Sequence, residues 1–283
     1  MWSLPEWIGR HLPSDGDPTG LGTLAAYATW CNAVEGNTTF YAVPSERTVA
    51  AWSEQAPPDF RFCFKLPRTI THDRRLRRGA DDLDDFLSAI TPLADRCGPV
   101  QIQLPPSFGP DDIEALVEFI ATVPKSDWSW AVEVRHHQFF PGGGHERALN
   151  DVLARHGVNR VLLDSRPLFS GPCQTPAEIE AFQNKPRVPV RPVATGTQPI
   201  VRFIGLTDPE ATARHWQQWL SKVAEWLELD LEPFVFVHTP DNIEGLQLNR
   251  RFHADLRALA AARDLVVAPL SEPTEPTRQL DLF

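Results

Sequence analysis

Polar side chains recur at or next to the carboxyl end of seven short apolar segments. They are Glu35 with Asn37, Lys65, Gln103, Glu133 with Arg135, Asp164, Arg202 and His238. Carboxylates and imidazoles serve as general acids and bases, whereas arginine and lysine bind anionic groups. We therefore take Glu35, Glu133, Asp164 and His238 as catalytic candidates. The ligand-binding candidates are Asn37, Tyr41, Lys65, Arg68, His72, Gln103, Arg135 and Arg202.

The signs of these charges narrow the ligand. Lys65, Arg135 and Arg202 offset the three carboxylates, which disfavours a two-metal site because such a site needs surplus carboxylate and histidine ligands. We therefore expect no resident cofactor. A single divalent ion held by Glu133, Asp164 and His238 remains an alternative. Mixed charge otherwise suits an anionic small molecule or nucleic acid.

A strongly basic loop follows the second apolar run of this set. The segment KLPRTITHDRRLRR, residues 65–78, holds six cations against the single carboxylate of Asp73. One interpretation is a solvated helix end balanced by the acidic run at 81–85. The other is a phosphate-binding surface that Lys185, Arg187 and Arg191 extend.

The apolar runs predict strands, and amphipathic stretches predict helices between them. Strands are expected at 33–37, 60–66, 100–104, 130–135, 160–164, 200–205 and 234–239. Helices are expected near 21–32, 46–56, 81–96, 110–122, 146–156, 176–184, 208–229 and 244–263. This alternation predicts parallel βαβ units, in which alternate strand residues point inward and the strand ends share one face. The 35 residues between Asp164 and Ile200 form an unusually long connection, which often serves a site.

The composition is that of a globular protein. The 283 residues carry a net charge of −10, and 42% are hydrophobic. The four cysteines show no metal-ligand spacing, no secretory leader is recognisable, and no apolar run is long enough to span a membrane. We expect a cytoplasmic protein without membrane contact, with one domain at 1–269 and a flexible C-terminal tail at 270–283.

Several long motifs resemble those of the YecE-like family, a group defined as a domain of unknown function. They include VEGNTTFYAVPSERTVAAW, DFRFCFKLPRTITH, GPVQIQLPPSFGP, AVEVRHHQFF and FVFVHTPDN. The resemblance covers about residues 1–263 and implies an α/β fold, a (β/α)8 TIM-type barrel, but no activity. Members begin with an apolar strand before a segment like WSLPEW, whereas here Met1 precedes Trp2 directly. The first strand is therefore expected to be short or missing, either because the true start lies upstream or because the barrel closes around a gap.

Three functions remain open. The first is a protein that binds or hydrolyses a phosphate-bearing ligand, possibly nucleic acid, at the carboxyl face of the strands. The second is a carbohydrate-active or sugar-isomerising enzyme that uses Glu133 and Asp164 as its carboxylate pair. The third is a non-catalytic adaptor that binds a small ligand.

The last five residues, QLDLF, resemble the motif by which bacterial replication and repair proteins bind the DNA sliding clamp. Gln279 would donate or accept hydrogen bonds at the mouth of the clamp's groove, and Leu280, Leu282 and Phe283 would fill the groove. The preceding SEPTEPTR has the polar composition of a tether. The alternative is that these apolar residues fold back onto the domain.

Overall fold

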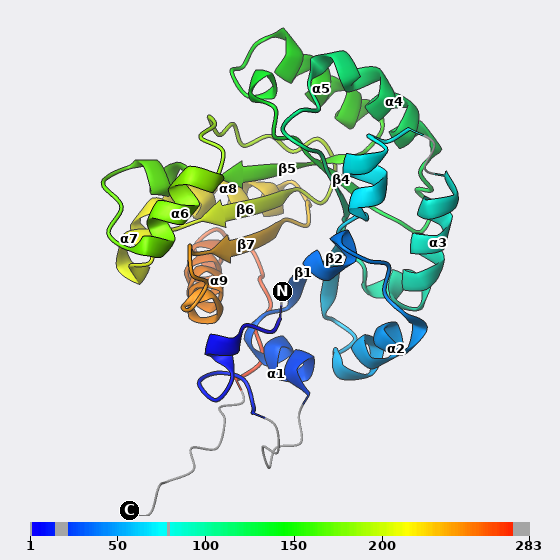
Figure 1. Ribbon diagram of the computed structural model, residues 1–283. Helices are drawn as coiled ribbons and strands as arrows, with labels where there is room; N and C mark the ends of the chain where they lie inside the picture. The colour runs from blue at the N-terminus through cyan, green and yellow to red at the C-terminus, as the bar shows by residue number, and fades with distance from the viewer. Residues whose placement is uncertain (1, 15–21, 78–79, 274–283) are drawn as a thin grey trace, which may run out of the picture.

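The computed structural model describes residues 2–14, 22–77 and 80–273, which form alternating strands and helices (Figure 1). All seven predicted strands are present. Their bounds are β1 (Ala33–Gly36), β2 (Arg61–Phe64), β3 (Val100–Gln103), β4 (Trp130–Glu133), β5 (Asn159–Asp164), β6 (Ile200–Ile204) and β7 (Phe234–His238).

Helices separate these strands, as the periodicity predicts. They are α1 (Thr23–Trp30), α2 (Glu46–Gln55), α3 (Ala80–Ile90), α4 (Ile113–Thr122), α5 (Gly144–Arg155), α6 (Pro176–Asn184), α7 (Pro209–His215), α8 (Gln217–Glu228) and α9 (Gly245–Ala261). The helix expected at 208–229 is divided into α7 and α8 at Trp216. Among the described residues, no helix combines the length and apolar character needed to cross a membrane.

The strands are parallel and belong to two sheets. One sheet is curled and has the order β3-β4-β5-β6-β7, and the other consists of β1 and β2. Two isolated bridges, Phe62 to Cys97 and Lys65 to Gln101, connect the two sheets. They join β2 and the residue after it to β3 and the residues just before it. The carboxyl ends of all seven strands therefore lie toward one side of the molecule, as they do in parallel sheets.

The prediction of a (β/α)8 TIM-type barrel is wrong. Within the described residues no strand ladder joins β7 to β1, and the segment before β1 forms a short helix (Pro5–Trp7), a local Ile8–Leu12 bridge and α1. On the open edge of β7, the side chain of Asn249 takes the place of a neighbouring strand. It accepts from the Val237 N–H at 3.0 Å and donates to the Val237 carbonyl at 2.8 Å. The five-stranded sheet is thus a half-barrel whose edge is satisfied by a helix side chain.

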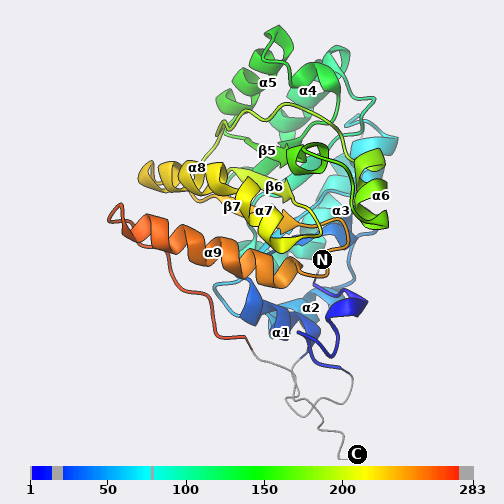
Figure 2. The same cartoon turned by 90° about the vertical axis from the view of Figure 1, so that its left-hand side faces the viewer.

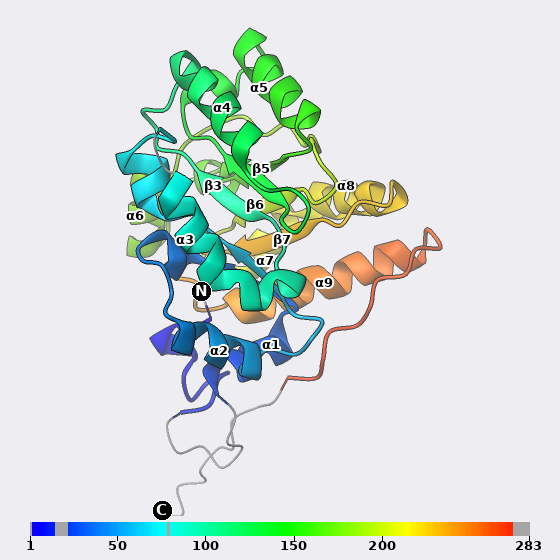
Figure 3. The ribbon, with the colours of Figure 1, turned by 90° about the vertical axis from the view of Figure 1, so that its right-hand side faces the viewer.

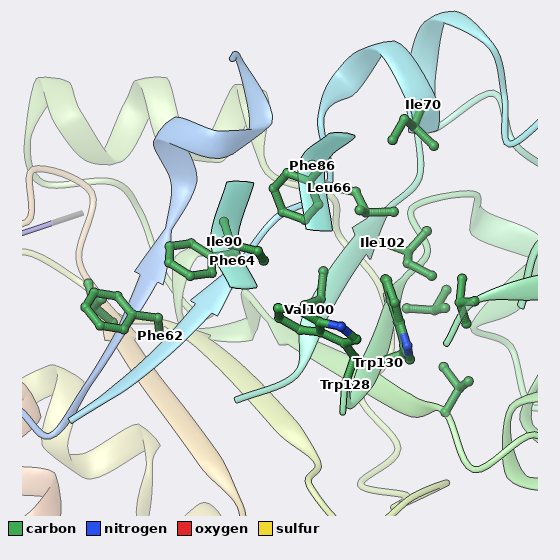
Figure 4. Packing of buried hydrophobic residues seen from close by; sticks show 14 of the residues in the cluster. Phe62, Phe64, Leu66, Ile70, Phe86, Ile90, Val100, Ile102, Trp128 and Trp130 are labelled. Carbon is green, nitrogen blue, oxygen red and sulfur yellow. The ribbon is translucent and has the colours of Figure 1, made fainter. Parts of the chain in front are cut away.

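The helices cover the outer faces of the strands. Helices α3, α4 and α5 lie along one side (Figure 3), and α7, α8 and α9 lie along the other (Figure 2). Phe62 and Phe64 point outward from β2 (Figure 4). They stack against Trp52 of α2, whose ring centroid is 6.4 Å from that of Phe62 and 5.6 Å from that of Phe64. Because neighbours in a strand alternate, Cys63 and Lys65 point to the interior, as predicted.

The long connection after β5 is ordered along its described length. It contains α6 and then an irregular, proline-rich stretch that returns to β6. Ser165 donates to the Pro186 carbonyl at 2.6 Å, and Thr195 donates to the Val158 carbonyl at 2.7 Å. These bonds fix the connection over the sheet and bring Lys185, its first residue after α6, toward the strand ends.

The predicted tail begins inside the described region. The Ser271 carbonyl accepts from Arg250 of α9 at 2.7 Å, so the chain runs beside α9 at this point. Residues 274–283, with the QLDLF motif, lie outside the described residues.

Candidate functional site

Strand register brings most of the predicted polar residues together at the carboxyl ends. Glu35 is level with Cys63, Gln103 with Glu133, and Arg202 with Leu163. We call the resulting group the strand-end cluster. Its members are Glu35, Lys65, Gln103, Glu133, Arg135, Arg202 and His238.

Arg202 lies at the centre of this cluster. Its Nε is 2.6 Å from Oε1 of Glu35, and its Nη1 is 3.0 Å from Oε2 of Glu133. The residue is 8% exposed and both carboxylates are buried. One guanidinium therefore joins carboxylates from β1 and β4, which belong to different sheets.

The two carboxylates are ionised despite their burial. Burial alone would raise the pKa of Glu133, but the charges of Arg202, Arg135 and Lys65 lower it to about 2. Burial also acts to raise the pKa of Glu35, and Arg202, Lys65 and the His238 hydrogen bond hold it well below its ordinary value. Nearby cations thus outweigh desolvation at both positions.

Lys65 is buried in the same cluster and donates to Gln103 Oε1 at 2.9 Å. Burial, together with the neighbouring charge of Arg202, lowers its pKa to about 8, against the opposing effect of Glu35 and Glu133. Within the described residues, neither Lys65 nor Lys185 has a carboxylate at ion-pair distance. Lys65 is therefore mostly protonated at neutral pH, with an amide oxygen as its partner.

His238 lies between the cluster and an adjoining cavity. Its Nε2 is 3.0 Å from Oε2 of Glu35. Burial lowers the pKa of His238, although the hydrogen bond to Glu35 acts in the opposite direction. The imidazole is therefore neutral at pH 7.

A cavity of about 210 Å³ adjoins the cluster. Glu35, Asn37, Arg202 and His238 form one part of its wall, and Lys185 approaches from the long connection. Partial desolvation beside the cavity lowers the pKa of Lys185, and the charges of Arg202 and Arg135 lower it further. The apolar part of the wall includes Leu4, Trp7, Tyr27 and Phe236.

Trp7 and Tyr27 escaped the sequence reasoning because they come from segments before β1. Trp7 Nε1 is 3.0 Å from the carbonyls of both Asn242 and Ile243, in the turn after β7. The sequence signal that could have found Trp7 is its place in WSLPEW, beside the segment where a strand was expected.

Asp164 does not join the cluster. It is level with Phe203, not with Arg202, and its carboxylate accepts from Trp219 Nε1 of α8 at 2.7 Å and from Arg166 Nη2 at 2.7 Å. It therefore faces the outer helices. The expectation that seven strand ends deliver polar groups to one face fails at this strand.

Other ligand-binding candidates lie around the rim. Asn37 lines the cavity, and Tyr41 is 75% exposed with its ring against Phe40. His72 packs edge-to-face against Phe40 and bonds to the Thr71 hydroxyl at 2.9 Å. Burial lowers the pKa of His72, and the charges of Arg135 and Arg68 lower it further.

The described arginines of the basic loop are paired with carboxylates, and Arg78 lies outside the described residues. Arg68 contacts Asp73 at 3.3 Å, Arg74 contacts Asp82 at 2.7 Å, and Asp112 receives Arg75 at 2.6 Å and Arg77 at 3.6 Å. The Arg74–Asp82 pair fits the interpretation in which the acidic run at 81–85 balances the charge of the basic loop. These pairs leave the loop less able to attract an extended polyanion.

The three residues considered for a single divalent ion are separated, because Asp164 lies on the outer face. Within the described part of the chain, no group of three or more His, Cys, Asp or Glu side chains is placed to hold a metal ion.

Comparison with protein families gives a match over residues 1–275 to a model described as "Protein of unknown function DUF72". Two curated relatives are UPF0759 protein YecE from Escherichia coli K12 and from Escherichia coli O157:H7. Each is 42% identical over 257 residues, which cover 91% of this chain and 90% of the relative.

Solved structures with a similar fold include two DUF72 family proteins. One, from Thermotoga maritima, has a TM-score of 0.62 at 22% identity and covers 89% of this chain and 96% of its own. The other, from Enterococcus faecalis, has a TM-score of 0.58 at 19% identity, with coverages of 81% and 92%. At this identity the likeness concerns the fold alone.

Proposed function

The chain belongs to the DUF72 family, a family of unknown function, and we propose that it binds a small phosphate-bearing ligand at the strand-end cluster. The membership confirms the resemblance to YecE-like proteins drawn from the motifs. The ligand is proposed from the charges and the cavity of this chain.

The main observation behind the proposal is that the cluster holds more cations than are needed to pair with its two carboxylates. Arg202 and Arg135 already pair with Glu35 and Glu133, and Lys65 and Lys185 add positive charge without a close carboxylate. Arg202 and Lys185 line the same cavity. A phosphate there would receive charge-assisted hydrogen bonds, which are about twice as strong as neutral ones.

The proposal favours a small molecule over nucleic acid. The cavity of about 210 Å³ accommodates a compact ligand, and the chain carries a net charge of −10. The sugar-enzyme alternative required Glu133 and Asp164 as a pair, and these residues lie on opposite faces of the sheet.

Isothermal titration of the full chain with inorganic pyrophosphate, a sugar phosphate, a tricarboxylate and a single-stranded oligonucleotide tests the proposal. We expect saturable binding of the first two. Binding of the tricarboxylate alone would refute the phosphate assignment. Oligonucleotide binding that weakens steeply with salt, without binding of the small phosphates, would replace the small ligand by nucleic acid. No binding of any probe would refute the proposal.

Replacing Lys185 with methionine is expected to weaken pyrophosphate binding at least about tenfold, because a hydrogen bond to a charged group contributes about 1.5–3 kcal/mol. Lys185 is exposed and has no ion pair within the described residues, so folding should be unaffected. The matched control is Lys125→Met, an exposed lysine in the loop before β4. Equal affinities for both variants would show that Lys185 does not contact the ligand.

The C-terminal sequence supports a second proposal, binding to a DNA sliding clamp. Gln279, Leu280, Leu282 and Phe283 match four positions of the motif, and a polar segment precedes them. Deleting residues 279–283 is expected to abolish micromolar binding to the sliding clamp of the same bacterium. The measurement is surface plasmon resonance with the intact and shortened chains. Equal binding by both, or none by either, would exclude the motif as an anchor.

A further inference from the structure

His238 and Glu35 form an imidazole–carboxylate pair at the wall of the cavity. Nε2 of His238 is 3.0 Å from Oε2 of Glu35. The other carboxylate oxygen of Glu35 is 2.6 Å from Arg202 Nε and accepts a 3.4 Å hydrogen bond from Gln101 Nε2. Both oxygens of Glu35 are therefore held, and the direction of the imidazole is fixed through Nε2.

This contact determines which nitrogen of His238 carries the proton. An ionised carboxylate can only accept hydrogen bonds, so the contact requires a proton on Nε2. Burial opposes ionisation of Glu35, but the charges of Arg202 and Lys65 keep its pKa well below the ordinary value. His238 is neutral at pH 7 because burial lowers its pKa. A neutral imidazole protonated on Nε2 has its free lone pair on Nδ1.

The lone pair on Nδ1 is available for a ligand. Within the described residues Nδ1 has no hydrogen-bond partner, and the His238 side chain is 25% exposed. The residue lines the same cavity as Arg202, Lys185 and Asn37. If Arg202 and Lys185 hold the phosphate of a ligand, the ligand atoms next to that phosphate lie beside the imidazole.

We infer that His238 is a general base that removes a proton from a hydroxyl group of the ligand, with Glu35 as its positioning residue. The inference rests on the proposed binding of a phosphate-bearing ligand and narrows that ligand to one with a hydroxyl group near the phosphate. The O–H bond breaks, an N–H bond forms at Nδ1, and the electron pair stays on the ligand oxygen. Glu35 stabilises the imidazolium, and Arg202 and Lys185 stabilise the oxyanion.

Nitrogen NMR of the full chain labelled with ¹⁵N-histidine tests the tautomer, with His238→Gln used to assign the signal. We expect a protonated Nε2 and an unprotonated Nδ1 at pH 7. Burial lowers the pKa of the ring, and the described charged groups that act on it are Glu35 on β1 and Arg202 on β6. Lys185 of the long connection lines the same cavity. In Glu35→Gln the tautomer preference should be reduced. A proton on Nδ1, or an imidazolium at pH 7, would refute the inference.

Carbethoxylation by diethyl pyrocarbonate, followed by mass spectrometry, tests the access of Nδ1. His238 should react, and saturating pyrophosphate should slow its reaction several-fold, whereas the exposed His145 should react at an unchanged rate. Pyrophosphate binding without protection of His238 would refute the general base and leave the binding proposal intact. An absence of pyrophosphate binding in calorimetry would refute the binding proposal, and with it the inference.

Discussion

Replacing Arg202 with methionine is expected to lower the free energy of unfolding by about 3–5 kcal/mol, because it leaves two buried carboxylates without their shared cation. Glu133 is completely buried and Glu35 nearly so, and Arg202 contacts both at 2.6–3.0 Å. Methionine keeps much of the side-chain volume, so the loss reports the charge and its hydrogen bonds. Urea unfolding at pH 7, monitored by tryptophan fluorescence, measures it.

The matched control is Arg251→Met on α9. Arg251 also binds a carboxylate through two nitrogens, at 2.6 and 3.0 Å from Glu210, but the two side chains are 40% and 67% exposed. Solvent screens an exposed ion pair, so this variant should remain close to the wild type. Similar losses in both variants would mean that the buried network does not stabilise the fold as described.

The second large effect is a decrease in the free energy of unfolding when Glu133 becomes protonated in acid. Burial would raise the pKa of Glu133, but Arg202, Arg135 and Lys65 lower it to about 2 in the folded chain. A group with a lowered folded pKa stabilises the protein above its unfolded pKa, and this contribution is lost as the pH falls toward the folded value. We expect Glu133 to account for on the order of 3 kcal/mol of stability lost between about pH 5 and pH 2.

Glu133→Gln tests this assignment because the amide does not titrate. The variant should be much less stable than the wild type at pH 6, and the difference should shrink steadily as the pH approaches 3. Glu118→Gln, an exposed position on α4, should keep the wild-type pH profile. If the profiles of Glu133→Gln and the wild type run parallel over this range, Glu133 is not the group that titrates.

The strands and their polar ends could be predicted from the sequence. In FRFCFK and VQIQ, polar and apolar residues alternate, so the local pattern indicates which side chains face the interior. The structure confirms that Lys65, Gln103 and Glu133 meet there. The alternation is a property of neighbouring residues and needs no knowledge of the rest of the fold.

The same reasoning failed at Asp164 because β5 is buried on both faces. Every residue from Asn159 to Asp164 is buried, so RVLLD shows no alternation from which to assign the faces. The register with β6 decides the matter: Leu163 is level with Arg202, and Asp164 turns toward Trp219 on α8. A shift of one residue exchanges the two faces of a strand.

Closure of the sheet and the pairing of charges depend on contacts between distant segments. The alternation of strands and helices is the same whether or not a strand lies between β7 and β1, so it did not decide between a closed barrel and an open sheet. The barrel was implied only by the family resemblance. The tertiary structure instead places Asn249 on the edge of β7. It also brings Glu35 to His238 and Glu133 to Arg202, pairs separated by 203 and 69 positions. Sequence periodicity therefore determined which residues face inward on most strands, whereas long-range packing decided which charges neutralise one another.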